Sequence, residues 1–211
     1  MNASAVSSVR SIHAWLLAIF MVVLTWSAIA PFNYFIWLLE IFPALIGVGL
    51  LIATFPRFQF TTFAYTAILL HCTVLAVGAH YTYGDMPLFE WIQQQFDLSR
   101  NHYDRFGHIA QGFFPAIVAR EILIRLSPLE SGKWLFFVVT SICLAVSALY
   151  EMVEWWVAVA TGSAADLFLA TQGDVWDTQW DMFLALCGAM AAQLIFAGYH
   201  DRKIATLHQR P

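Results

Sequence analysis

Three pairs of ionisable residues have the spacing that places both members on one face of a helix. The pairs are Asp104 with His108, Glu151 with Glu154, and Asp177 with Asp181. Carboxylates combined with one to three histidines form ligand sets that suit zinc, iron or manganese. A divalent metal held in this way activates a water molecule for attack on an ester or phosphoester. The pattern therefore predicts a metal-assisted site, with the identity of the metal left open.

We assign each of these residues, with two neighbours, an expected role. The expected metal ligands are His102, Asp104, His108 and Asp181, and the expected catalytic residues are Glu151, Glu154, Asp177 and Arg105. One or two carboxylates would act as base or acid, and Arg105 would hold a phosphate or a neighbouring acid. His102 lies six residues before His108, a poor match for one helix face. It would reach the site from the loop or from a frayed first turn.

Other uses of the same residues stay open. Arg105 could pair with Asp177 or Glu154, while Asp104 and Asp177 cap the N-termini of their helices. Such a cluster would lock the packing of the helices without catalysis. A proton or ion path is the third interpretation, because ionisable groups inside a membrane are costly and usually functional.

The elements that carry these residues are expected to lie in lipid. The 211-residue chain is 60% hydrophobic and 11% charged, whereas soluble domains are about 25% charged. Its net charge of −4 argues against a nucleic-acid partner. Three cysteines, Cys72, Cys143 and Cys187, fall in apolar runs without C-x-x-C spacing. We expect them to be buried thiols and not a disulfide framework or zinc site.

Six apolar segments approach the length of about 20 residues that a membrane span needs. They are 13–30, 34–54, 60–80, 106–126, 134–158 and 179–199. The expected fold is an all-α polytopic membrane bundle forming a single domain over residues 1–211. Pro43 is tolerated as a kink in the second span. The first span resembles a signal peptide with Ala28-Ile29-Ala30 as its cleavage site, but its length favours an uncleaved span.

Basic residues orient the bundle in the membrane. With a cytoplasmic N-terminus, the inside carries Arg10, Arg57, Arg120, Arg125, Lys133, Arg202, Lys203 and Arg210, and the outside only Arg100 and Arg105. Both termini are then cytoplasmic, and the loops at about 81–105 and 159–178 face outward. All three acid and histidine pairs fall in the outer third of the bilayer. The string MPLFEWIQQQF in the first outer loop predicts a short helix at the membrane interface.

The cytoplasmic side shows little chemistry in the sequence. Its connections near Phe55–Gln59 and Ser127–Lys133 are short, and His13, His200 and His208 are expected to be solvated. His71 lies near mid-bilayer, where we expect a buried histidine bonded to a neighbouring helix. Gly188 and Ala192 form a small-residue face that predicts close helix packing.

Four strings carry a resemblance to a known family. AHYTYGDMPL, RNHYDRFGHIAQGF, ALYEMVEWW and GDVWDTQWDM resemble the YjdF-like family of bacterial inner-membrane proteins over about residues 60–195. That resemblance implies fold and location and supplies no reaction. Separately, the order Glu151, Glu154, Asp177, Asp181 and Gly188 is similar to the last two helices of VanZ-like proteins. The usual asparagine between aspartate and glycine is missing, and the similarity implies shared architecture only.

The sequence supports two hypotheses of function. The first is an envelope enzyme with a metal-assisted site that acts on a lipid or lipid-linked substrate at the outer leaflet. The second is a non-enzymatic membrane protein, either a small transporter or a packing and interaction subunit. A transporter should carry ionisable groups along both halves of its path, often with internal repeats. This sequence concentrates its paired acids on one side and shows no repeat; the sequence predicts no oligomeric state.

Overall fold

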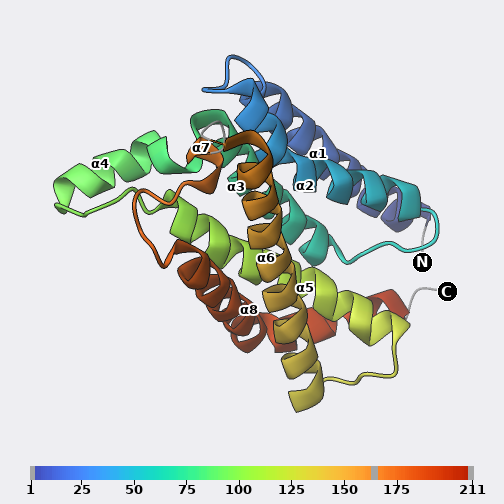
Figure 1. Ribbon diagram of the computed structural model, residues 1–211. Helices are drawn as coiled ribbons and strands as arrows, with labels where there is room; N and C mark the ends of the chain where they lie inside the picture. Colours follow the sequence, from blue (N-terminus) through green and yellow to red (C-terminus); the bar gives the residue numbers. More distant parts are fainter. Residues whose placement is uncertain (1–2, 163–165, 209–211) are drawn as a thin grey trace.

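The computed structural model describes residues 3–162 and 166–208, and throughout these ranges every element of regular structure is helical (Figure 1). The elements are α1 (Ala3–Ser27), α2 (Tyr34–Thr54), α3 (Thr62–Tyr81), the 3-10 turn η1 (Tyr83–Asp85), α4 (Pro87–Gln95), α5 (Tyr103–Leu126), α6 (Lys133–Thr161), α7 (Asp166–Leu169) and α8 (Asp177–His208). The expected all-α membrane bundle is confirmed. Arg210, one of the charges used to orient it, lies outside the described residues.

Within the described ranges, four helices are long and apolar enough to cross a membrane. They are Tyr34–Thr54, Thr62–Tyr81, Lys133–Thr161 and Asp177–Leu207. The apolar part of α1, Ser11–Ser27, is shorter. Helix α5 carries charged residues in its first and last turns, but its middle, from Ile109 to Ala119, has none. For α1 and α5, a membrane-spanning position therefore remains an expectation, and so does the total of six spans.

Local sequence signals fix where the helices begin. The side chain of Asn33 accepts hydrogen bonds from the backbone N–H groups of Phe35 and Ile36, and so caps α2. Thr61 caps α3 in the same way by accepting from the N–H of Ala64. Pro43 lies inside α2 as expected, since a membrane helix can re-satisfy the backbone group that a proline frees.

Helix α5 is the centre of the bundle and packs most extensively on α8. The two backbones touch, because a Cβ on Gly112 would lie 1.8 Å from the carbonyl oxygen of Ala185. A Cβ on Gly188 would lie 2.2 Å from the carbonyl oxygen of Ile109. No other residue type fits at either position without moving the helices apart, which confirms the close packing expected at Gly188.

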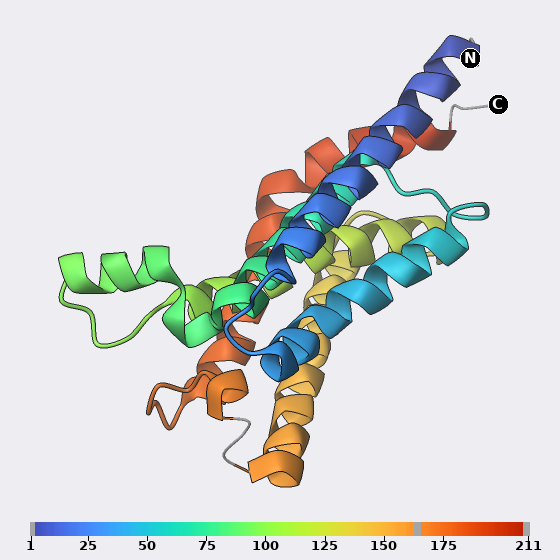
Figure 2. The same cartoon turned by 90° about the horizontal axis from the view of Figure 1, so that it is seen from above.

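The two chain termini lie at the same end of the bundle in both views (Figures 1 and 2). We call this end the terminus side. The opposite end, with the connections 82–102 and 170–176, is the loop side. Helix α4 projects from the loop side away from the bundle (Figure 2) and exposes Leu88 and Trp91. The short helix expected in this loop is therefore present; its position in the headgroup layer stays a prediction.

Candidate metal centre

The first two turns of α5 carry the core of the site. Asp104 and His108 are 5% and 6% exposed, and 3.6 Å separates Oδ1 of Asp104 from Nε2 of His108. Neighbouring residues hold this helix end in place. The hydroxyl of Tyr103 donates to the carbonyl of Val74 at 2.8 Å, and the side chain of Asn101 accepts from the N–H of Tyr103 at 3.0 Å. The expected i,i+4 pair is thus anchored to α3.

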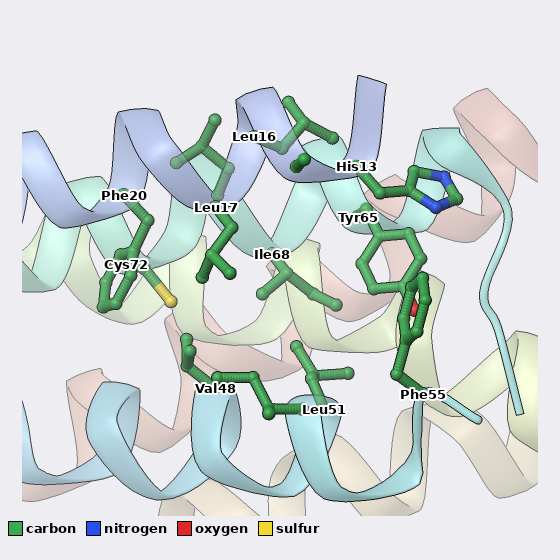
Figure 3. A pocket seen from close by; sticks show the side chains of 13 residues that line it. His13, Leu16, Leu17, Phe20, Val48, Leu51, Phe55, Tyr65, Ile68 and Cys72 are labelled. Atoms are coloured by element: carbon green, nitrogen blue, oxygen red, sulfur yellow. The ribbon is translucent and has the colours of Figure 1, made fainter. Parts of the chain in front are cut away.

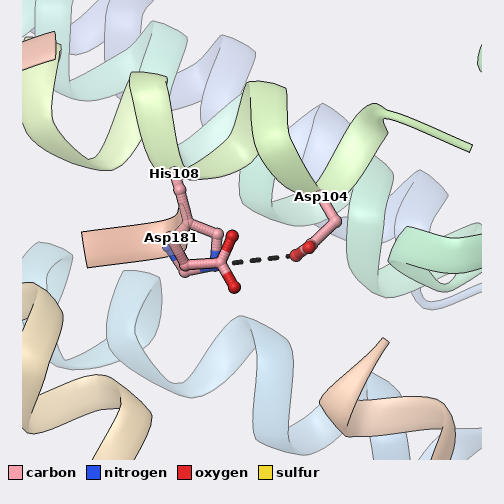
Figure 4. Close-up of side chains that lie close together, drawn as sticks. All are labelled: Asp104, His108 and Asp181. Carbon is pink, nitrogen blue, oxygen red and sulfur yellow. Dashed lines mark ion pairs between the residues drawn. The ribbon is translucent and has the colours of Figure 1, made fainter. Parts of the chain in front are cut away.

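Helix α8 brings the third group to the same point. The close approach of α5 and α8 places Oδ1 of Asp181 3.9 Å from Nε2 of His108. Asp104, His108 and Asp181 each offer one ligand atom, and these atoms all lie within 4.8 Å of one another (Figure 4). Oε1 of Glu151 on α6 lies 3.9 Å from the same Nε2. Three helices thus surround one imidazole nitrogen with three carboxylate oxygens.

These separations are too long for hydrogen bonds and suit a shared cation. Metal–ligand bonds of about 2.1 Å in a tetrahedral site place neighbouring ligand atoms about 3.4 Å apart. Glu151 Oε1 and Asp181 Oδ1 are buried and have no hydrogen-bond partner among the described residues. Buried polar atoms are nearly always paired, so these two oxygens need an explanation. A cation between them and His108 would supply one.

A neighbouring amide orients the histidine. Nδ1 of His108 lies 2.8 Å from Oε1 of Gln111, one turn further along α5. In this arrangement Nδ1–H donates to the amide oxygen and leaves the lone pair of Nε2 directed at the carboxylates. Hydrogen bonds of this kind set the tautomer and ring orientation of metal-ligating histidines. Nothing in the sequence singled out Gln111, because its role depends on the rotamer of His108.

Two arginines pair with acids of the cluster. Arg100 donates to Asp177, to Oδ2 of Asp104 at 3.2 Å and to the carbonyl of Ala170 at 3.2 Å. Arg105 donates to Asp174 at 2.6 Å and to Asp177 at 3.3 Å. Arg105 thus contacts Asp177, one of the two acids that the sequence suggested as its partner. We define the loop-side cluster as Arg100, Asp104, Arg105, His108, Glu151, Asp177 and Asp181.

The remaining expected residues lie at the edge of this cluster. His102 is half-buried at the N-cap of α5 without a side-chain capping bond, and it is not part of the ligand group. Burial lowers its pKa, and the charges of Arg100 and Arg105 lower it further. Glu154 is half-buried, one turn beyond Glu151. Of the four expected ligands, the structure brings three together.

Two residues at the site were not among those expected to act there. The sequence presented Arg100 only as an outer positive charge, yet it is 7% exposed and joins α5 to the start of α8. Glu40 is 4% exposed although it lies on α2, most of which faces outward. It lies close enough to Asp104 and His108 to interact with their charges, and is therefore next to the cluster. A lone acid in an otherwise apolar span was the available signal.

A second polar cluster lies at the other end of α5, where the sequence showed little chemistry. Glu121 is fully buried, and its two oxygens accept from the N–H and hydroxyl of Thr61 at 2.8 and 2.7 Å and from Arg125 at 2.8 Å. His200 lies 3.0 Å from the same carboxylate. Arg120 pairs with Asp201 at 2.7 Å, and Ser131 bonds to both residues. We define the terminus-side cluster as Thr61, Arg120, Glu121, Arg125, Ser131, His200 and Asp201.

The expectation that the terminus-side histidines are solvated was wrong for two of them. His200 is 1% exposed and His13 is 9% exposed. His13 lies 3.2 Å from the hydroxyl of Thr62. Both histidines pack between helices because polar partners on α3 and α5 compensate for their burial. The side chain of His208 lies outside the described residues.

Comparison with known proteins agrees with this architecture. Residues 12–202 match the family described as "Predicted membrane protein (DUF2238)". The chain belongs to this family. It is 46% identical over 182 residues to the inner membrane protein YjdF of Escherichia coli (strain K12), covering 86% of this chain and 87% of the relative. No solved structure matches the chain. The resemblance over residues 60–195 is thereby confirmed and extends into the first helix.

Proposed function

We propose that the loop-side cluster binds one divalent transition metal. The protein would use this metal to hydrolyse a lipid or lipid-linked substrate in the leaflet on the loop side. The observation that carries this proposal is the position of His108 Nε2, with three carboxylate oxygens at 3.6, 3.9 and 3.9 Å. Asp104, His108 and Asp181 would be the ligands, with Glu151 beside them. Imidazole with carboxylates favours zinc, iron or manganese over magnesium or calcium.

The balance of charge supports a cation at this position. The carboxyl groups in and around the cluster are Glu40, Asp104, Glu151, Glu154, Asp174, Asp177 and Asp181. Arg100 and Arg105 face Asp104, Asp174 and Asp177. On the inner side, Glu151 faces His108, and Asp181 faces His108 and, at 4.0 Å, Arg105. The acids outnumber the cationic groups, and buried carboxylates without compensation are strongly unfavourable. A divalent metal would compensate for two of these negative charges.

The chemistry that fits is hydrolysis of an ester or phosphoester. A metal lowers the pKa of a bound water to about 7, which makes it a nucleophile at neutral pH. The water oxygen would form a bond to the carbonyl carbon or to phosphorus, and the ester bond would break. Glu151 would take the proton of the water and return it to the leaving oxygen. Since the arginines are paired with acids, a substrate phosphate would rely on the metal for charge neutralisation.

Proteoliposomes made from bacterial total lipid extract provide the test of this function. We expect the metal-loaded protein to convert one lipid class, with the product detected by mass spectrometry, and Glu151→Gln to reduce the rate by at least about 100-fold, as loss of a general base does. His71→Ala is the matched control, because His71 is a histidine on α3 outside the ligand group. Metal-loaded protein that leaves every lipid class unchanged would contradict hydrolysis and leave a structural metal.

A second candidate is a non-enzymatic packing role, which a separate observation favours. Arg100 bridges Asp104 on α5, Asp177 on α8 and the carbonyl of Ala170. Such a network joins two helices and a loop without needing a metal. If this is its only role, Asp181→Asn and His108→Ala would leave the phenotype of cells intact, whereas Arg100→Ala would disturb folding.

A further inference from the structure

Helices α1 and α2 each pack against α3 and leave a cavity of about 410 Å³ between them (Figure 3). Its walls are apolar. They include Leu17 and Phe20 from α1, Val48 and Leu51 from α2, and Ile68 and Cys72 from α3. This cavity shares no residue with the loop-side cluster, so its occupant does not depend on the proposed metal site.

Neither water nor empty space suits a cavity of this kind. Each buried water needs two to four polar partners, and among the described residues of these walls the only polar side chains are His13, Tyr65 and the thiol of Cys72. If the cavity were empty, every side chain around it would lose its dispersion contacts on that side. The cavity adjoins surfaces that face lipid, because Val22 on α1 and Leu50 and Ile52 on α2 are 58–70% exposed. Hydrocarbon from the bilayer is the filling that meets these conditions.

The cavity extends along the three helices that line it. The lining runs from His13 to Phe20, from Val48 to Phe55 and from Tyr65 to Cys72. Each stretch covers two helical turns, roughly 10 Å. An acyl chain extended along these stretches would contact side chains of all three helices.

One end of the cavity is polar and lies at the terminus side. His13, Phe55 and Tyr65 line this end, and the ring of His13 packs on Tyr65 with centroids 4.5 Å apart. Arg57 follows Phe55 by two residues and is exposed. A length of roughly 10 Å corresponds to most of one leaflet, since half of the hydrocarbon core is about 15 Å thick. The cavity is thus apolar along most of its length and polar at one end, as a phospholipid in one leaflet is.

We propose that this cavity holds an acyl chain of an anionic phospholipid from the terminus-side leaflet, with its phosphate near Arg57. The lipid fills the space between α1 and α2 and so secures α1, whose principal contact with the bundle is α3. It is an ordered component of the fold, distinct from the lipid that surrounds the protein.

A photoactivatable phosphatidylglycerol, with the reactive group on its acyl chain, tests this site in proteoliposomes. We expect strong labelling of peptides from α1 and α3 that line the cavity, and a loss of at least about fivefold in Val48→Trp, which fills the cavity. Leu50→Trp is the matched control, because Leu50 is on the same helix and 60% exposed to lipid; its labelling should equal that of the wild type. Equal labelling of Val48→Trp and wild type would overturn the proposal.

Thermal stability gives a second measurement. Phosphatidylglycerol added to delipidated protein should raise the Tm of the wild type and of Leu50→Trp, but not that of Val48→Trp. Arg57→Gln should reduce the advantage of phosphatidylglycerol over phosphatidylcholine; an unchanged advantage would refute the headgroup contact. If Val48→Trp does not fold, Cys72→Phe fills the cavity from α3. Crosslinks to a second polypeptide at these positions would replace the lipid with a protein partner and overturn the proposal.

Discussion

The two ends of α5 carry clusters made of the same residue types but arranged differently. At the terminus side, both oxygens of Glu121 accept hydrogen bonds from defined donors. At the loop side, one oxygen each of Glu151 and Asp181 is buried without such a donor among the described residues. In the first arrangement the protein itself satisfies the carboxylate, although Nδ1 of the buried His200 has no hydrogen-bond partner among the described residues. In the second, a cation would compensate the two carboxylate oxygens, so the difference distinguishes a packing device from a candidate site.

Removing Glu121 should have the largest effect on stability. Glu121→Ala leaves the buried His200 and the half-buried Arg125 without their carboxylate, and breaking a buried ion pair costs about 3–5 kcal/mol. We expect a corresponding fall in the unfolding free energy, measured by denaturant titration in mixed micelles. Glu130→Ala, an exposed acid at the same end, is the control and should change little. A loss below about 1 kcal/mol for Glu121→Ala would show that the terminus-side cluster is not a packing device.

The contact between α5 and α8 positions residues of both clusters, and a substitution of Gly112 tests this contact. A methyl group there meets the carbonyl of Ala185, so Gly112→Ala should cost about 1–3 kcal/mol by overpacking. It should also separate His108 from Asp181. The control is Gly47→Ala on α2, where a Cβ meets nothing within 4 Å. That variant should be neutral or slightly more stable, since alanine is the better helix former.

Removing an acidic group from the loop-side cluster should raise the stability of the protein, whereas removing Glu121 lowers it. Asp181→Asn keeps the shape of the side chain and removes one negative charge from a site shared with Asp104 and Glu151. In metal-free protein we expect the variant to gain about 1 kcal/mol, because like charges in one site repel. The isosteric control at the other end, Glu121→Gln, should lose stability. A loss above about 2 kcal/mol in Asp181→Asn would contradict the contrast between the clusters.

The smallest expected effect depends on pH and concerns Asp174 in the loop before α8. The N–H of Trp176 hydrogen-bonds to this carboxylate, and Arg105 pairs with it, so its pKa lies below the usual value. A lowered pKa contributes stability above the ordinary value near 4, and this contribution is lost as the pH falls through the folded value. Wild type should therefore exceed Asp174→Asn in Tm at pH 6. The difference should shrink as the pH falls below about 4. A constant difference would show that the charge of Asp174 does not contribute to stability.

The fold, and the position of the site residues at one end of the bundle, could be predicted from the sequence because both follow from short-range patterns. Apolar runs give the helices, and the i,i+4 spacing of Asp104 and His108 gives one face of α5. Asp181 was among the expected ligands, but its contact with His108 could not be predicted, since the order of helices around a bundle depends on contacts between distant residues. Gly112 and Gly188 make the closest of these contacts. The role of Gly112 becomes visible only with α8 in place.

The terminus-side cluster escaped prediction for a related reason. Glu121 and His200 are 79 residues apart, and each alone resembles an ordinary charged residue at a helix end. Their burial depends on α3 delivering Thr61 to the same point. Arg100 was missed because a single arginine in a loop is usually solvated, whereas here the loop before α5 folds back against the start of α8.

The metal content of the purified protein tests the central claim most directly. Protein purified without chelators or metal-affinity resin should contain about one equivalent of zinc, iron or manganese by elemental mass spectrometry. The double variant His108→Ala/Asp181→Asn should contain less than about a tenth of that amount, while His71→Ala keeps it. Folded wild type that holds no metal, and takes up none when each of the three ions is supplied, would contradict the account and leave the loop-side cluster as a second packing device.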